Sequence, residues 1–457
     1  MKSKIFIFLS LIIGLVAMTS CEVEEVFDQD NPTLGSVTSN ASKSQLQFLV
    51  TGLEARHRGY FGGAHTLFGN FGRETWNYNA SDPRSISDVL GITIADTYPD
   101  FFGSAGTYLT AYQAVKQANV LIAAAENSSF VNDQEEKGIT GFAKTIKAYQ
   151  LIWPWLQQWD NGARVDVAEV LNPGPILPRA EALDAIRAVL EDGYNDLKSA
   201  GSTFSFNLTA GFNGFKTPAD MIKVNRAIAA RLALYDEDWN GALTALNESF
   251  LNLNAATPAD MNVGPTHVYG EAPDANNPLY NPFDRATSSI LIAHPDWIED
   301  ALPGDQRVAT KVQKRLLNPV QNNGLKDAAG NLLIGEYQDA RWATNISPIP
   351  YIRNEELMLI YAEAKVRTNA GADAVTTINK IRNTWGVGNY GGATDTNALI
   401  EEILFQRRYS LWGEVGHRWI DLRRTDRLNS TYIDLRDRGK IFKQVARPTA
   451  ETNWEER

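Results

Sequence analysis

Apolar residues recur along most of this chain with the period of an α-helix. Between residues 108 and 126 the spacing is three or four positions, at Tyr112, Val115, Ala118 and Ile122. Similar stripes predict further helices at 142–156, 182–197, 221–235, 239–250, 354–368, 374–385 and 399–411. Gly413 is placed to end the last of these helices. The fold is therefore predicted to be mainly α.

The predicted helices come in pairs separated by polar turns, which is typical of tetratricopeptide repeats, although no complete repeat consensus aligns. The pattern breaks in two segments, 201–217 and 257–350, into glycine, asparagine, proline and aromatic residues without a sustained period. Such segments predict long loops or short strands, and long loops in compact proteins are usually functional. We expect tetratricopeptide-like helical repeats packed against an irregular, loop-rich half with few short strands.

The N-terminus has the features of a secretory signal. Lys2 and Lys4 precede an apolar run, Ile5–Ala17, and acidic residues follow directly after residue 21. The run is too short to cross a bilayer, which takes about 20 apolar residues. Residues 1–20 are therefore predicted to be a signal peptide.

Cys21 is the only cysteine of the chain and follows Met18-Thr19-Ser20, as in a lipoprotein box. Acylation of its thiol and of the new N-terminal amine would give several acyl chains, enough for a stable membrane anchor. The alternative is an ordinary signal peptide with a chance cysteine. The acidic residues that follow predict a flexible tether over 21–35, and a single globular domain is predicted for 36–457.

Composition narrows the possible ligands. The chain is 44% hydrophobic and 21% charged, as expected for a globular protein, and its formal net charge is −11. Nucleic acids and other polyanions are therefore poor partners. The 11 Trp, 16 Tyr and 19 Phe allow stacking on the apolar faces of neutral sugars, although most aromatic residues fill cores.

Sequence patterns for catalysis and metal binding are not found. There is no His-Glu-x-x-His, no Gly-x-Ser-x-Gly and no phosphate-binding loop, and the five histidines lack metal-ligand spacing. The segment Asp236–Gly241 begins like a calcium loop, but Asn247 stands where a bidentate carboxylate is needed. We interpret it as a polar turn between helices. No cofactor, metal or catalytic residue is predicted.

A glycoside hydrolase remains an alternative because it needs only two carboxylates. Asp296 with Glu299 or Asp300, beside Trp297, is the candidate pair. Acids at this helical spacing usually belong to a solvated helix face, so a binding function is preferred.

Two segments interleave aromatic rings with amide and charged side chains, as sugar-binding loops do. The first spans residues 73–79 and gives the candidate contacts Arg73, Glu74, Trp76, Asn77 and Tyr78, with Asn79 beside them. The second spans 269–297 and gives Tyr269, Tyr280 and Trp297. Trp153, Trp155 and Trp159 are assigned to helix packing instead.

Three phrases in the C-terminal third, Ile352–Ala364, Ile378–Asn383 and Arg407–Arg424, resemble the SusD/RagB family of outer-membrane nutrient-binding lipoproteins. This sequence departs from the family pattern at Gln406, Ser410 and Val415.

The resemblance implies a lipid-anchored protein on the cell surface, at the outer membrane. Such a protein binds an oligosaccharide or polysaccharide through loops in roughly the two segments above and passes it to a SusC-like TonB-dependent transporter. It is not an enzyme. The alternative ligand is a peptide or glycopeptide, as for a RagB-type uptake lipoprotein.

The charged residues of these phrases are predicted to be structural. We expect buried ion pairs that hold the last helices on the repeat half, with Trp419 stacked on Arg418. The residues are Arg353, Glu363, Arg382, Glu414, Arg418 and Asp421.

Overall fold

The computed structural model describes residues 34–79, 81–285, 289–317 and 320–455. The predicted signal peptide, Cys21 and the tether up to residue 33 lie outside the described residues, so the lipid anchor stays a prediction. Within the described part, every helix is too short or too polar to cross a membrane.

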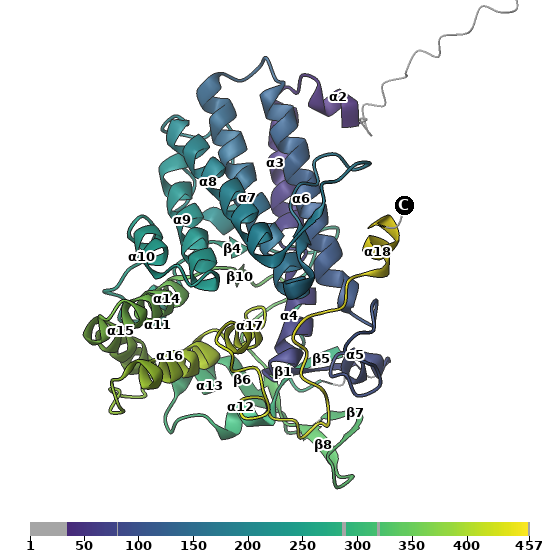
Figure 1. The fold of residues 1–457 in the computed structure, drawn as a ribbon, viewed down its shortest axis with the longest axis vertical. Coiled ribbons are helices and arrows are strands. Elements are labelled where there is room, and N and C mark those ends of the chain that lie inside the picture. Colours follow the sequence, from purple (N-terminus) through teal and green to yellow (C-terminus); the bar gives the residue numbers. More distant parts are fainter. Residues whose placement is uncertain (1–33, 80, 286–288, 318–319, 456–457) are drawn as a thin grey trace, which may run out of the picture.

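Helices dominate the architecture (Figure 1). In the first part of the chain they are α2 (Leu34–Thr38), α3 (Lys43–His57), α4 (Phe61–Phe71), α5 (Arg84–Ser87), α6 (Ser104–Glu126), α7 (Asp133–Gln158), α8 (Arg179–Ser199), α9 (Pro218–Tyr235), α10 (Trp239–Asn247) and α11 (Pro258–Met261). Later come α12 (Pro295–Glu299), α13 (Gln306–Lys311), α14 (Asn354–Arg367), α15 (Gly371–Thr384), α16 (Thr396–Ser410), α17 (His417–Arg424) and α18 (Thr449–Glu455). The described residues also include two 3-10 turns, η1 (Trp159–Asn161) and η2 (Ala210–Phe212).

The strands are short. They are β1 (Thr75–Asn79), β2 (Ala163–Arg164), β3 (Ile176–Leu177), β4 (Thr266–His267), β5 (Ser289–Ala293), β6 (Val312–Lys314), β7 (Val320–Lys326), β8 (Leu332–Gly335), β9 (Tyr337–Asp339) and β10 (Ile349–Pro350). One sheet has four strands in the order β1-β5-β9-β6, and the other three are two-stranded: β10-β4, β2-β3 and β7-β8.

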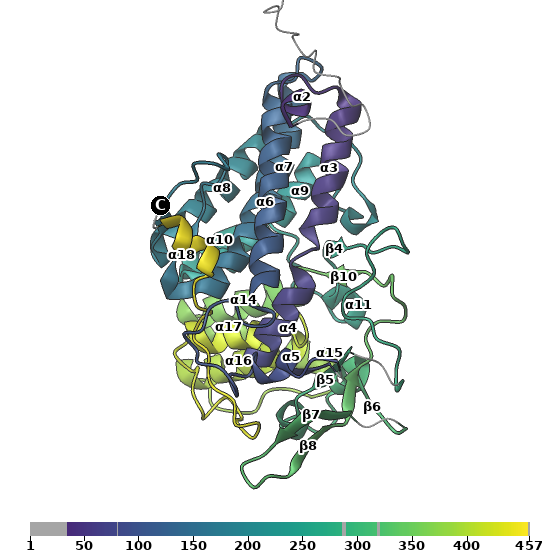
Figure 2. The same ribbon diagram turned by 90° about the vertical axis from the view of Figure 1, so that its right-hand side faces the viewer.

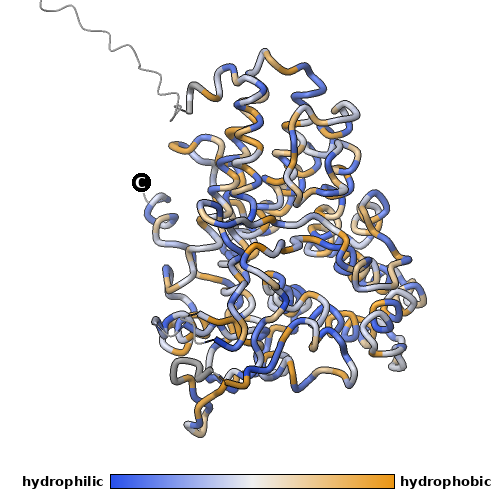
Figure 3. Tube along the Cα trace, turned by 180° about the vertical axis from the view of Figure 1, so that it is seen from behind, coloured by the Kyte–Doolittle hydropathy of each residue, from blue (hydrophilic) through white to orange (hydrophobic). Residues whose placement is uncertain are grey.

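The upper half of the molecule is a stack of helices in which each packs on the next along the chain (Figures 1 and 2). The contacts run from α3 to α6, α7, α8, α9 and α10, and continue through α14 to α15 and α16. Hydrophobic and hydrophilic positions interleave along these helices (Figure 3), as in amphipathic repeats. The predicted mainly α, tetratricopeptide-like fold with a loop-rich second half is confirmed.

Local sequence sets several helix starts. Asn132 and Glu135 form a capping box at α7, and Thr217 caps α9 with Pro218 in its first turn. Asp238 caps α10 by accepting from the Gly241 amide, and it also binds Arg187 at 2.8 Å. This confirms the interpretation of the calcium-like segment as a polar turn.

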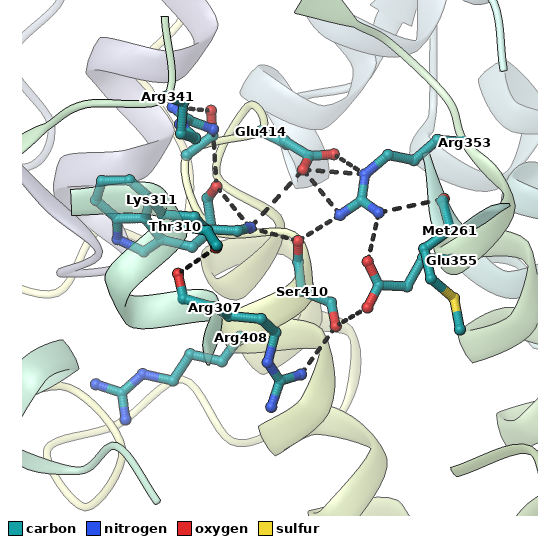
Figure 4. A network of polar contacts seen from close by, with 12 residues as sticks. Met261, Arg307, Thr310, Lys311, Arg341, Arg353, Glu355, Arg408, Ser410 and Glu414 are labelled. Atoms are coloured by element: carbon teal, nitrogen blue, oxygen red, sulfur yellow. Dashed lines mark hydrogen bonds and ion pairs between the residues drawn. The ribbon is translucent and has the colours of Figure 1, made fainter. Parts of the chain in front are cut away.

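The lower half contains a buried network of arginines and carboxylates (Figure 4). The Arg353 guanidinium lies between two carboxylates: it donates to Glu414 at 3.0 Å and also pairs with Glu355. Glu355 in turn accepts from the Ser410 hydroxyl at 2.6 Å and from the Trp385 indole at 2.6 Å. These contacts join α14, α15, α16 and the loop after α16.

The loop that presents Glu414 has three residues in the left-handed backbone region. Gly413, Val415 and Gly416 have φ values of +72°, +57° and +72°. A β-branched residue such as Val415 is disfavoured there, so the surrounding packing must impose the conformation. The backbone conformation of this loop therefore depends on the same network to which the loop contributes Glu414.

The remaining charged residues of the C-terminal phrases largely follow the prediction. Arg424 donates to Glu363 at 2.7 Å, and Asp421 accepts from Arg424 at 2.9 Å and from Arg407 at 2.6 Å. Arg382 pairs with Glu402 at 2.6 Å.

Two details of this prediction are wrong. Arg423, not Arg418, stacks on Trp419, with 3.9 Å between the guanidinium carbon and the ring centroid. Arg418 forms no ion pair within the described residues, and instead donates to the Tyr432 carbonyl at 2.5 Å. The tryptophans assigned to packing, Trp153, Trp155 and Trp159, are buried as expected.

Replacing Arg353 by methionine should reduce the free energy of unfolding by about 3–5 kcal/mol, because Glu355 and Glu414 would lose their main cation in a buried site. Urea unfolding measures the change. The matched control is Arg436→Met, at a more exposed ion pair with Glu299, which should cost about 1 kcal/mol or less. Equal losses in both variants would contradict a central role for Arg353.

Lys311 makes the network sensitive to pH. Its Nζ donates to the Ser410 carbonyl at 2.6 Å, and burial lowers its pKa to about 7. The unfolded chain, with the ordinary lysine pKa, binds more protons between pH 7 and 10. The free energy of unfolding should therefore rise with pH across this window, by at most about 1.4 kcal/mol per pH unit from this group.

Lys311→Met should remove this contribution, so its unfolding free energy should increase less from pH 7 to 9 than that of the natural chain. Lys314→Met is the control, since the Lys314 side chain is 49% exposed. An unchanged pH slope in Lys311→Met would show that Lys311 is not the group responsible.

Candidate functional site

The four-stranded sheet brings the two sequence-predicted binding segments side by side. β1 pairs with β5 in antiparallel register, from Thr75 opposite Ala293 to Asn79 opposite Ser289. The pairing continues beyond the sheet, because the His294 amide donates to the Glu74 carbonyl at 3.0 Å. The predicted segments are thus neighbours, about 220 positions apart in the sequence.

Burial contradicts the predicted role of both tryptophans. The Trp76 ring is 0% exposed and contacts His294 edge-on, with 4.6 Å between ring centroids. Trp297 is also 0% exposed and packs against Trp412 at 4.7 Å. Neither ring has a free face for a sugar, because both side chains point into the core.

Arg73 and Glu74 are buried as well, which corrects their assignment as ligand contacts. Arg73 forms an ion pair with Asp437 at 2.7 Å, and both side chains are 0% exposed. Neither carboxyl oxygen of Glu74 has a hydrogen-bond partner among the described residues, and burial raises its pKa to about 8. These two side chains belong to the interior beneath the sheet.

The other four predicted contacts are half-buried at the surface. Tyr78 packs beside Ile290 and Ile292, and the Arg58 guanidinium lies over the Tyr269 ring at 5.5 Å. Asn77 and Tyr280 are likewise half-buried. For Asn77, Tyr78, Tyr269 and Tyr280 a ligand contact stays a prediction.

A cavity of about 790 Å³ lies between α12, α16, α17, the segment 430–435 and Tyr390, which follows α15. Its lining combines carboxylates, arginines and half-buried aromatic rings. The charged and aromatic side chains of the lining include Asp296, Asp300, Tyr390, Phe405, Arg408 and Tyr432. None of the eight residues predicted from the sequence lines it.

Arg408 anchors the polar wall of the cavity. Its guanidinium binds Asp296 at 2.5 Å and Asp300 at 2.6 Å. Burial raises the pKa of Asp296; for Asp300, partial burial is outweighed by the hydrogen bond from Arg408, and its pKa is lowered. Glu299, the third acid of the candidate hydrolase pair, instead binds Arg436 at 2.6 Å.

The opposite part of the lining is also held in place by ion pairs. Glu401 accepts from Arg427 at 2.6 Å and from the Tyr432 hydroxyl at 2.8 Å. Arg418 lines the cavity beside Arg408, and burial, with the charge of Arg408, lowers its pKa to about 10. The cavity therefore offers acceptors and donors in fixed positions.

Such a lining can recognise a polyhydroxylated molecule. Carboxylates accept from hydroxyl groups, guanidinium groups donate to ring and hydroxyl oxygens, and the tyrosine and phenylalanine rings can stack on apolar sugar faces. The sequence analysis singled out Asp296 and Asp300 of this lining, as candidate hydrolase carboxylates. It did not predict Tyr390, Phe405 or Tyr432, because none of them stands in an aromatic-rich loop.

Comparison with known proteins agrees with this fold. Residues 334–456 match the model of the SusD family. A comparison with curated proteins finds no match.

Solved structures share the fold over most of the chain. A SusD superfamily protein from Bacteroides vulgatus is 16% identical, covers 87% of this chain and 92% of its own, and superposes with a TM-score of 0.63. B. fragilis NanU is 15% identical, with coverages of 93% and 97% and a TM-score of 0.63.

Surface glycan-binding protein A from Bacteroides thetaiotaomicron, solved in complex with laminarihexaose, is 13% identical. The match covers 91% of this chain and 98% of that one, with a TM-score of 0.66. At these identities the likeness establishes a shared fold. Residues 334–456 are thus similar to the SusD family, and the chain shares the fold of SusD superfamily structures over most of its length.

Proposed function

We propose that this protein is a lipid-anchored cell-surface protein of the outer membrane that binds an oligosaccharide and passes it to a SusC-like TonB-dependent transporter. The observation that carries the proposal is the cavity beside Arg408, whose lining combines fixed carboxylates and arginines with aromatic rings. A structure of the same fold in complex with laminarihexaose supports the choice of a glycan.

Preorganisation makes the cavity suitable for capture. The side chains of Asp296, Asp300 and Glu401 are already held by arginines, so binding a sugar does not have to order them. A partly open cavity with hydroxyl contacts and stacking should bind with modest affinity. Modest affinity suits a protein that must release its ligand to a transporter.

Binding without cleavage is the favoured mode of action. A glycosidase places its two carboxyl groups on either side of the scissile bond, about 5–9 Å apart. Asp296 and Asp300 instead lie one helical turn apart and bind the same guanidinium, so they belong to one wall of the cavity. The proposal also includes the lipid anchor at Cys21 and transfer of the ligand to the transporter. The alternative ligand is a peptide or glycopeptide.

Tyr390→Ala should weaken oligosaccharide binding about five- to tenfold, because one stacking ring of the cavity is removed and such a contact is worth about 1 kcal/mol. Calorimetric titration of the mature protein lacking Cys21, with neutral oligosaccharides including laminarihexaose, measures the affinity. Circular dichroism checks that the variant is folded.

The matched control is Tyr280→Ala, at a half-buried ring that the sequence predicted as a contact but that lies outside the cavity. Its affinity should equal that of the natural chain. If Tyr280→Ala weakens binding and Tyr390→Ala does not, the glycan site is beside the four-stranded sheet. Binding of peptides with no response to any sugar would support the peptide alternative.

A further inference from the structure

A second concave surface lies far from the Arg408 cavity in the sequence, on helix α6. It is a groove of about 510 Å³ between α6, the segment 164–173 and the C-terminal residues 448–454. Its base is apolar and aromatic: the Tyr108 and Tyr112 rings meet edge-on at 4.9 Å, beside Val167, Val170 and Trp454. The proposed glycan site does not use this groove.

The apolar surface continues out of the groove onto the exterior. Leu109 is 56% exposed, Val170 is 55% exposed and Leu171, next to it, is 88% exposed. Exposed apolar side chains that gather around a concave surface mark sites of protein contact. Lys116 lines the groove, is exposed, and forms no ion pair within the described part of the chain. A partner is therefore expected to bring apolar side chains and a nearby acidic group.

The short helix α18 closes one side of the groove. None of its residues is buried, and it is held by the ion pairs of Arg164 with Glu451, at 2.8 Å, and with Glu455. Arg164 is itself fixed, because its carbonyl accepts from the Tyr112 hydroxyl at 2.9 Å. The groove is thus preformed and open on the side of Leu109.

The start of the described chain places this groove relative to the predicted anchor. α2 packs on α6, and Asn40 accepts from the Ser129 amide at 2.9 Å, just beyond the C-terminal end of α6. Leu34 follows Cys21 by about 13 residues, which span at most about 45 Å. The groove lies about 15–30 Å back along α6. Lipid anchoring at Cys21 would therefore hold the groove close enough to the membrane for contact with a protein embedded in it.

We propose that this groove seats an apolar loop of the membrane-embedded transporter, with an acidic side chain of that loop near Lys116. The proposal rests on the transporter partnership of the proposed function and names its contact surface on this chain. The short reach of the tether favours a partner in the same membrane, and the exposed apolar rim favours a protein loop over a sugar.

Leu109→Asp tests the contact, because it introduces a charge at the open side of the groove without altering a buried side chain. Phe130→Asp is the matched control: Phe130 is 54% exposed and lies beyond the end of α6, outside the groove. Each tagged, full-length lipoprotein is purified from detergent-solubilised outer membranes of its own host. The transporter, identified by mass spectrometry, is quantified per lipoprotein.

Leu109→Asp should lower the amount of co-purified transporter about tenfold or more, and Phe130→Asp should leave it within about twofold of the natural ratio. Lys116→Glu should also lower it, whereas glycan titration of all three variants should be unchanged. A natural ratio in Leu109→Asp overturns the groove assignment and leaves the proposed function standing. If the natural protein itself retains no transporter while it still binds glycan, the transporter partnership fails and the groove assignment with it.

Discussion

A guanidinium can be buried without a large loss of stability only where carboxylates or carbonyls hydrogen-bond to it, and this requirement positions the C-terminal helices. Arg353 can be satisfied only if Glu355 of α14 and Glu414 of the loop after α16 lie on either side of it. Once α16 is fixed in this way, its other charged positions are fixed too. Arg408 on the same helix then reaches the cavity and orders Asp296 and Asp300. Fold stability and the shape of the recognition surface thus depend on one helix.

The sequence predicts the helical half well because an amphipathic stripe can be recognised within one segment, without knowledge of what that segment packs against. The stripes beginning at Tyr108 and Phe142 correspond to α6 and α7, and the C-terminal phrases correspond to α14 to α17. No helix was predicted at α4, whose 11 residues include three glycines. The structure explains them: a Cβ at Gly63 would lie 2.9 Å from the Thr107 amide nitrogen, so glycine allows α4 to approach α6 closely. The close approach depends on both helices, so it cannot be predicted from the sequence of either helix alone.

The candidate site was harder to predict, for a different reason. Rings interleaved with amides and charges occur both in binding loops and in strands or short helices that turn their rings into the core, and the local pattern does not distinguish these two cases. Trp76 and Trp297 belong to the second case. The cavity, in contrast, is assembled from α12, α16, α17 and the segment 430–435. Each contributes only a few ordinary residues to the lining, so the cavity cannot be recognised in any single stretch of sequence.

The contacts of β1 also bear on how the chain reaches its folded state. The Trp76 indole donates to Asp437, 361 positions later, and the Trp412 indole donates to the Glu74 carbonyl across 338 positions. Contacts between such distant residues carry a high loop-closure entropy and are associated with slow folding. The N-terminal strand cannot bury its tryptophan until nearly the whole chain has been synthesised. Until Trp412 and Asp437 have been made, β1 has neither of these partners, so the packing of this N-terminal strand is completed by residues from the last tenth of the chain.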